Sequence, residues 1–191
     1  MELQRLGAKC FLDETSQLEL GDLVPVFHSW IQKKVVEDHI LVDVHNYSHV
    51  PRGPGILLVA HEGNFSMDSG DDHLGLLYYR KQPLEGSLES RLGQIFRITL
   101  QAARRLEEEP RLGKVRFKTD KFLLVANDRL KAPNTQAAFE QLEPELSVFF
   151  RRLLDGDDFT LARPEDPRER LTVKVSTGVS DDTEVLLGRL P

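Results

Sequence analysis

The residues best suited to chemistry lie between His61 and His73, in the stretch HEGNFSMDSGDDH. It contains two histidines, one glutamate, three aspartates, one asparagine and two serines. Imidazole and carboxylate groups together form either a mixed nitrogen and oxygen site for a divalent metal ion or a general acid–base pair. We expect this stretch to be a loop of thirteen residues joining two apolar strands. It is the first candidate for a functional site.

Six polar residues of this loop have a predicted role. The roles are catalytic for Glu62 and Asp68, metal-binding for His61, Asp68 and His73, and ligand-binding for Asn64 and Ser66. If the loop begins as extended chain, side chains alternate, so Glu62, Asn64, Ser66 and Asp68 share one face and His61 lies on the other. This predicts a soluble protein that binds a small molecule or a divalent metal ion, with hydrolase-like chemistry as an extension. Whether the chain is an enzyme stays open.

No motif in the loop specifies a reaction. His61-Glu62 is followed by Gly63-Asn64-Phe65, so the zinc motif HExxH is absent. An EF-hand alignment places Ser69 where the calcium loop requires glycine, and Gly75 where it requires glutamate. The same residues equally suit a solvated hairpin tip with no chemistry.

A second candidate is NDRLKAPN, residues 127–134, which follows a predicted strand and precedes a predicted helix. Asp128 and Arg129 are the candidate ligand-binding residues, because N–H groups at a helix start can hold an anion together with an arginine. The competing interpretation is a strand-to-helix loop in which Asn127 and Asn134 satisfy the turn geometry. The functional alternative is an anion- or nucleotide-binding protein with an open basic pocket in an acidic surface.

Composition limits the classes of function. The chain has 191 residues and a net charge of −6, and a basic stripe suited to nucleic acid is absent from the sequence, so we expect no nucleic-acid partner. No apolar run approaches the roughly 20 residues needed to cross a bilayer, and we expect no membrane partner. The single cysteine, Cys10, reads as a small buried hydrophobe and fits a reducing compartment. We therefore expect a cytoplasmic protein.

Apolar periodicity predicts an α+β fold. Alternating or continuous apolar runs predict strands at 8–12, 40–44, 56–60, 74–79, 114–119, 122–126, 159–162 and 171–176. Three amphipathic helices are expected at 22–36, from Ser87 to about residue 106, and from Thr135 to about residue 154, the last kinked or broken at Pro144. These elements predict a mostly antiparallel sheet of about 7–8 strands with three helices on one face. We expect one domain over 1–176 and a poorly ordered tail over 177–191.

A weak internal repeat and the apolar strands give two further expectations. Segments 56–109 and 115–156 both follow the order strand, connection, strand, helix, with the longer connection at 61–73. Long connections in compact domains are often functional. The runs ILLVA and FLLVA favour a sheet covered on both faces, which predicts a homodimer. A non-catalytic, homodimeric protein–protein interaction module is therefore the other functional alternative.

Overall fold

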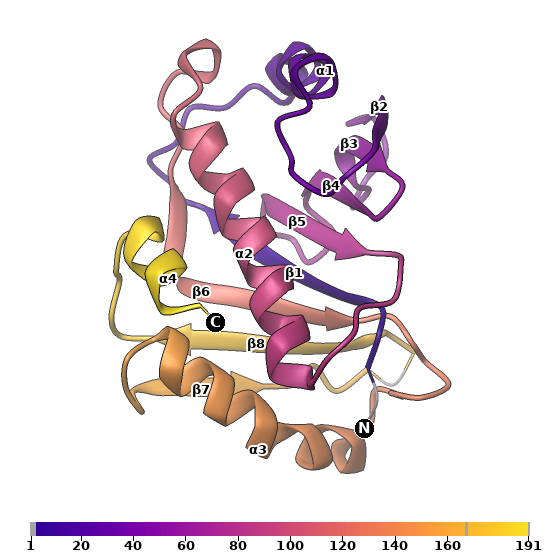
Figure 1. The fold of residues 1–191 in the computed structure, drawn as a ribbon, viewed down its shortest axis with the longest axis vertical. Helices are drawn as coiled ribbons and strands as arrows, with labels where there is room; N and C mark the ends of the chain where they lie inside the picture. Colours follow the sequence, from indigo (N-terminus) through magenta and orange to yellow (C-terminus); the bar gives the residue numbers. More distant parts are fainter. Residues whose placement is uncertain (1–2, 167, 191) are drawn as a thin grey trace.

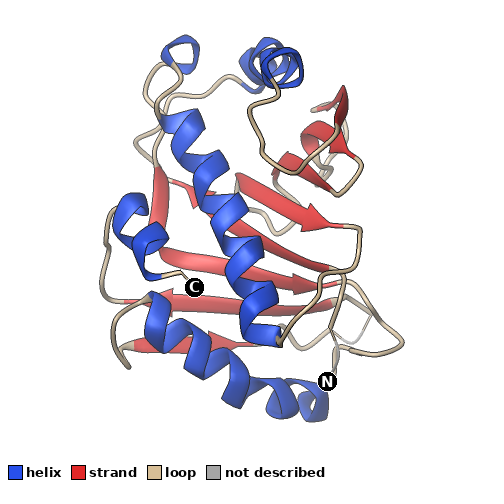
Figure 2. Ribbon diagram, in the orientation of Figure 1, coloured by secondary structure: helices blue, strands red, loops and turns tan. Residues whose placement is uncertain are grey.

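The computed structural model of the chain describes residues 3–166 and 168–190. They form an eight-stranded sheet in the order β2-β3-β4-β5-β1-β6-β8-β7, with neighbouring strands antiparallel (Figures 1 and 2). The strands are β1 (Leu6–Leu12), β2 (Leu41–Tyr47), β3 (Gly55–Ala60), β4 (Gly63–Asp68), β5 (Gly75–Arg80), β6 (Phe117–Ala126), β7 (Phe159–Ala162) and β8 (Leu171–Thr177). The helices are α1 (Leu23–Lys33), α2 (Leu88–Glu107), α3 (Gln136–Leu153) and α4 (Thr183–Arg189), with short 3-10 turns η1 (Leu20–Asp22) and η2 (Pro110–Leu112). The predicted α+β class is confirmed.

The helices pack on one face of the sheet and enclose the main core. Helix α2 lies across the middle of the sheet in Figure 1 and contacts β1 and β5. It begins at Ser87, whose hydroxyl accepts a hydrogen bond from the Ser90 N–H (3.2 Å), so one of the free donors of the first turn is satisfied. Helix α1 adds Trp30, whose ring packs edge-on against Phe65 of β4. Among the described residues, no helix covers the other face of the sheet.

Strand β1 shows how the sequence assigns residues to the two faces. Leu6, Ala8 and Cys10 are buried under the helices, whereas Lys9 and Phe11 lie on the helix-free face, because successive side chains of a strand point in opposite directions. Lys9 is opposite Leu77 of β5 and Leu123 of β6. A small second apolar cluster therefore covers the centre of the helix-free face.

The predicted thirteen-residue loop at 61–73 is wrong, because six of its residues form strand β4. Phe65 and Met67 are fully buried on the helix side, and Asn64, Ser66 and Asp68 alternate with them on the other face. The three residues share one face as predicted. The stretch looked like a loop because its helix-free face carries polar side chains, although its period of two is that of a strand.

Strand β6 also differs from the prediction. Thr119-Asp120-Lys121 was expected to turn a hairpin, but β6 runs through it as one strand, with a register irregularity against β1 between Cys10 and Leu12. The first segment of the predicted repeat thus has three strands before its helix, and the second has one. A bulge absorbs the polar interruption without reversing the chain.

Two helical segments bear on the remaining predictions. Helix α3 passes Pro144 without a break, and Pro144 is exposed, so the carbonyl that loses its donor faces water. The segment expected to be a poorly ordered tail contains α4, which contacts α2 and α3. Leu186 of α4 is 1% exposed, so this helix contributes to the main core.

Candidate functional site

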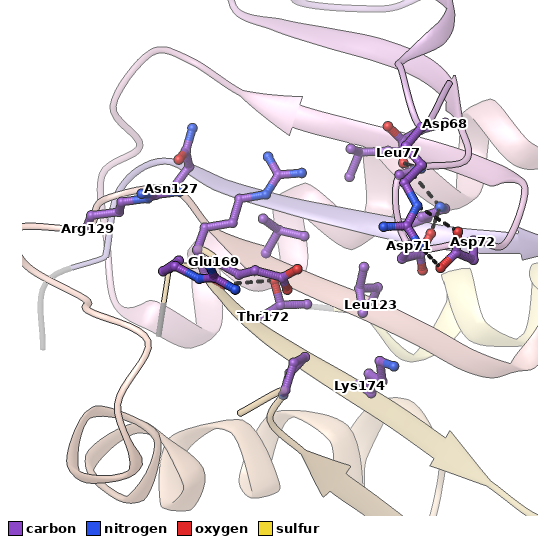
Figure 3. Close-up of a pocket in the computed structure, with 17 residues that line it drawn as sticks. Asp68, Asp71, Asp72, Leu77, Leu123, Asn127, Arg129, Glu169, Thr172 and Lys174 are labelled. Atoms are coloured by element: carbon purple, nitrogen blue, oxygen red, sulfur yellow. Dashed lines mark hydrogen bonds and ion pairs between the residues drawn. The ribbon is translucent and has the colours of Figure 1, made fainter. Parts of the chain in front are cut away.

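The helix-free face of the sheet carries a pocket of about 650 Å³ (Figure 3). Its floor is the apolar cluster of Leu77, Leu123 and Val125, contributed by β5 and β6. The turn between β4 and β5 lines one side, and the segment leading into β8 lines the other. A neighbouring hollow of about 560 Å³ shares Asp71, Asp72 and Lys174 with it. The free face is therefore concave over β5, β1, β6 and β8.

One side of the pocket is acidic, but its carboxylates are already paired. Lys9 donates hydrogen bonds to Asp68 (3.2 Å), to Asp71 and to the carbonyl of His73 (2.7 Å). The Lys9 side chain is 1% exposed, and removing a lone ammonium this far from water would be very costly. The two carboxylates balance the buried charge of Lys9, and Lys9 in turn fixes the 68–73 turn against the sheet.

Asp72, at the outer end of this turn, is paired with Arg52. The guanidinium donates two hydrogen bonds to the carboxylate, from Nε to Oδ1 (2.9 Å) and from Nη2 to Oδ2 (2.5 Å). Both side chains are more than 60% exposed, so the pair adds little to stability. Its effect is local: it joins the turn after β2 to the turn after β4 at the rim of the pocket.

The opposite side of the pocket is basic. Arg129 comes from the segment after β6, Arg170 directly precedes β8, and Lys174 lies on β8 itself. Arg170, Thr172 and Lys174 are two residues apart, which places them on one face of the strand. Among the described residues, none of the three cations has an ion pair, whereas neighbouring Arg168 is paired with Asp166 (2.8 Å).

Buried hydrogen bonds hold the two basic segments together. The Asn134 amide is 4% exposed and donates to the carbonyls of Pro164 (3.1 Å) and Asp166 (2.7 Å). Arg163 donates to the Asn134 side-chain oxygen (3.1 Å) and to the Pro164 carbonyl (2.8 Å). A buried amide satisfied in this way fixes the backbone around it. These bonds join the segment that carries Arg129 to the segment that carries Arg170.

The first candidate site does not converge. His61 and Glu62 lie in the turn before β4, and Asp68 is the last residue of β4. A six-residue strand separates its two ends by roughly 17 Å. Glu62 instead accepts the Ile40 N–H (2.7 Å) and anchors the start of β2. Glu62 and Asp68 therefore cannot act on one substrate atom as acid and base.

The predicted metal ligands do not meet either. His73 lies near Asp68 along the chain, but its ring packs edge-on against Phe11 (5.9 Å), and its Nδ1 lies 3.1 Å from the Asp71 carbonyl. Within the described residues, no group of three or more His, Cys, Asp and Glu side chains is arranged to hold a metal ion. The geometry gives the predicted metal site no support.

The predicted ligand-binding residues separate into two groups. Arg129 lines the pocket, as does Asn127, while Asp128 accepts the Lys131 N–H (3.4 Å) and serves as a turn residue. Asn64 accepts the Ala60 N–H (3.4 Å), and Ser66 is 5% exposed beside Leu57 and Leu77. The N-terminus of α3 is capped by Thr135 and does not line the pocket. Arg129 thus belongs to a basic pocket, but without the expected helix start.

A separate, partly buried polar contact joins the segment between α1 and β2 to strand β5. The Nε2 atom of His39 is 2.7 Å from the hydroxyl of Tyr78, which is fully buried. Burial lowers the pKa of His39, and the nearby Arg80 lowers it further. Burial also raises the pKa of the Tyr78 hydroxyl. This contact holds the segment between α1 and β2 against the sheet.

Cys10 has the character that its sequence context predicts. It is 1% exposed on the helix side of β1. Burial, with a smaller contribution from Glu107, raises the pKa of the thiol to about 12. A buried and protonated thiol is a poor nucleophile, which confirms its interpretation as a small hydrophobe.

Sequence reasoning missed Lys9, Arg170 and Lys174. A signal existed for the two lysines, because Lys9 interrupts the apolar run GAKCFL and Lys174 interrupts LTVKV. In a strand with one face covered by helices, every second side chain points to the uncovered face. Each lysine occupies such a position. No sequence pattern indicated that β1 and β8 lie close together in the sheet, separated only by β6.

Fold and pocket together define an α+β protein with a one-sided antiparallel sheet and a basic pocket on its free face. Comparison of the chain with protein-family models, curated proteins and solved structures gave no match. Over residues 3–166 and 168–190, no helix is both long and apolar enough to cross a membrane.

Proposed function

We propose that this chain binds an organic anion with an apolar or aromatic body in the pocket over β5, β1, β6 and β8. The observation that carries the proposal is that Arg129, Arg170 and Lys174 all line one pocket, without ion pairs among the described residues. Like charges held together repel one another, and the chain as a whole is acidic at −6. An anionic ligand would relieve this repulsion and gain charge-assisted hydrogen bonds.

The chemistry of the walls narrows the ligand class. Arginine presents a planar set of donors that fits carboxylate and phosphate groups in pairs. Leu77, Leu123 and Val125 form a floor that favours contact with a flat apolar group. The carboxylates of Asp68, Asp71 and Asp72 are already paired with Lys9 and Arg52. Glu169 is the remaining carboxylate of the lining, and Arg129, Arg170 and Lys174 outnumber it, so the basic side keeps a net positive charge. An acyl carboxylate and a nucleotide both have the required combination.

The proposal bears on two of the functions that were predicted from the sequence. The metal-dependent, hydrolase-like function loses its basis, because His61 and Glu62 lie far from Asp68 along β4. Self-association remains a prediction, and strand β2 rather than the concave face offers a surface for it. As part of the proposal we place the protein in the cytoplasm, since its one cysteine is a buried free thiol.

The test uses the fluorescent anion 8-anilinonaphthalene-1-sulfonate as a probe, because it combines an aromatic body with one negative group. We expect saturable binding that weakens by about tenfold, equivalent to roughly 1.4 kcal/mol, in the double variant Arg129→Ala, Arg170→Ala. The matched control is Arg151→Ala, Arg152→Ala on α3, which removes the same charge from exposed positions outside the pocket lining. Thermal unfolding checks that both variants are folded.

Competition then separates the two ligand classes. Displacement of the probe by ATP favours a nucleotide, and displacement by decanoate favours an acyl carboxylate. Equal weakening in the pocket variant and in the α3 control would refute the proposal, because the probe would then report only net charge. Binding that is unaffected by either double variant would refute it as well.

A further inference from the structure

Strand β2 forms a long, open edge of the sheet. Its outer side has no partner strand among the described residues, and the opposite edge, β7, has four residues against seven in β2. Four of the eight large apolar side chains that are exposed in the described chain gather here: Ile40 (65%), Val42 (59%), Val50 (41%) and Tyr47 (37%). An exposed apolar edge of this kind is a template for pairing with another strand.

The backbone of β2 is available for pairing at Val44. Its N–H donates to the side chain of Asp43 (2.7 Å) instead of to β3, so this residue directs its backbone groups toward the free edge. On the helix-free face, His45 lies 3.5 Å from the same Asp43 carboxylate. Asp43 thus protects the edge of a single chain.

From this arrangement we propose that a second copy of the chain pairs with β2, antiparallel, across a two-fold axis at Val44. A two-fold axis requires that one surface fit itself. With Val44 opposite Val44 of the second copy, Asp43 faces His45 of the second copy, and His45 faces Asp43 of the second copy. Asp43 and His45 are hydrogen-bonding partners across the two copies, and once the imidazole is protonated they form pairs of opposite charge. Such cross-strand pairs stabilise an antiparallel pair, and like charges oppose it.

The same register also brings the apolar residues together. Because the strands run in opposite directions, Tyr47 at the end of one β2 lies opposite Leu41 at the start of the other, and Val42 lies next to this pair. Burying them on both sides of the axis adds apolar area to the backbone bonds. The result is a continuous sixteen-stranded sheet, formed from two eight-stranded ones.

The dimer is expected to be weak. Pairing must exchange the bond between Asp43 and the Val44 N–H for a bond between the two copies, and an edge contact is smaller than the roughly 1,200 Å² of a stable interface. We therefore expect a concentration-dependent equilibrium. The pocket lining includes no residue of β2, so self-pairing does not depend on the anion-binding proposal.

The test is sedimentation equilibrium over a wide concentration range with three variants. His45→Asp places carboxylates opposite carboxylates at both ends, and it should weaken the dimer by at least about tenfold. The charge swap Asp43→His, His45→Asp restores opposite pairs only if β2 meets β2 in this register, and it should return the dissociation constant close to the original. His49→Asp, an exposed turn residue outside the paired region, is the control for charge.

Each outcome decides the proposal. The proposal is supported if His45→Asp weakens the dimer, the charge swap restores it and His49→Asp leaves it unchanged. A wild-type chain that stays monomeric overturns it, and so does a dimer that His45→Asp leaves unchanged. If the His45→Asp variant is folded and the charge swap does not restore its dimerisation, the proposed register is overturned, and the two-fold pairing with it. Far-ultraviolet circular dichroism confirms that every variant is folded.

Discussion

Lys9 on β1 reaches the carboxylate of Asp68 on β4 (Nζ to Oδ1, 3.2 Å) by passing over Gly75 of the strand between them. A Cβ atom at Gly75 would lie 2.8 Å from Cε of Lys9 and 2.4 Å from the Cys10 carbonyl oxygen. The absence of a side chain at one position of β5 therefore allows an ion pair across three strands. That pair fixes the acidic side of the pocket.

Replacing Lys9 should destabilise the fold. In Lys9→Met, Asp68 and Asp71 lose their shared cation, and breaking a buried pair typically costs about 3–5 kcal/mol. The side chains of Asp68 and Asp71 are 15% and 22% exposed, so water can partly solvate them. We therefore expect a smaller loss of unfolding free energy, about 1–3 kcal/mol. Urea unfolding measures it. Lys174→Met, on the same face but without an ion pair among the described residues, should change stability by less than about 0.5 kcal/mol.

Adding a methyl group at Gly75 should have a related effect. Gly75→Ala forces Lys9 and the β1 backbone to move, and overpacking of this kind costs about 1–3 kcal/mol. Hydrogen exchange should also speed up in the 68–73 turn as Lys9 is displaced. The control is Gly188→Ala in α4, where a Cβ meets nothing within 4 Å, and helix propensity predicts a small gain. Equal stability of the two variants would contradict this account of Gly75.

His39 should make stability depend on pH. Burial lowers its pKa in the folded chain, so the unfolded chain binds the proton more readily near the ordinary value of about 6.5. The stabilising contribution is present above that value and is lost as the pH falls through the folded-state pKa. His39→Gln should remove this contribution. The measurement is the difference in unfolding free energy between wild type and variant, and a difference that does not change with acidification from neutral pH would show the idea to be mistaken.

Helix α4 should contribute to global stability through Leu186. Leu186→Ala removes a side chain that is 1% exposed, and such truncations cost about 2–5 kcal/mol. Val185→Ala on the same helix, at a position 43% exposed, should cost less than about 1 kcal/mol. Thermal unfolding of both variants compares them directly. If the two variants unfold at the same temperature, α4 does not belong to the cooperative core.

Local patterns predicted most of the secondary structure. Ser87 and Thr135 cap α2 and α3 as expected, each accepting a hydrogen bond from an N–H three residues later. The missed elements were β4 and α4. In β4 the buried Phe65 and Met67 alternate with polar residues that suggested a loop, and in α4 the buried side chains are few. Short elements carry little periodicity, and their stability comes from the sheet and helices that they contact.

The sequence by itself determined the α+β class and the inert character of Cys10. These follow from periodicity and polarity, which act between residues close in the chain. Only the tertiary structure decided that His61 is far from Asp68, that Lys9 pairs with Asp68 and Asp71, and that Arg129 shares a wall with Arg170. Those relationships depend on strand order, which places β1 between β5 and β6 and is set by the packing of the whole chain.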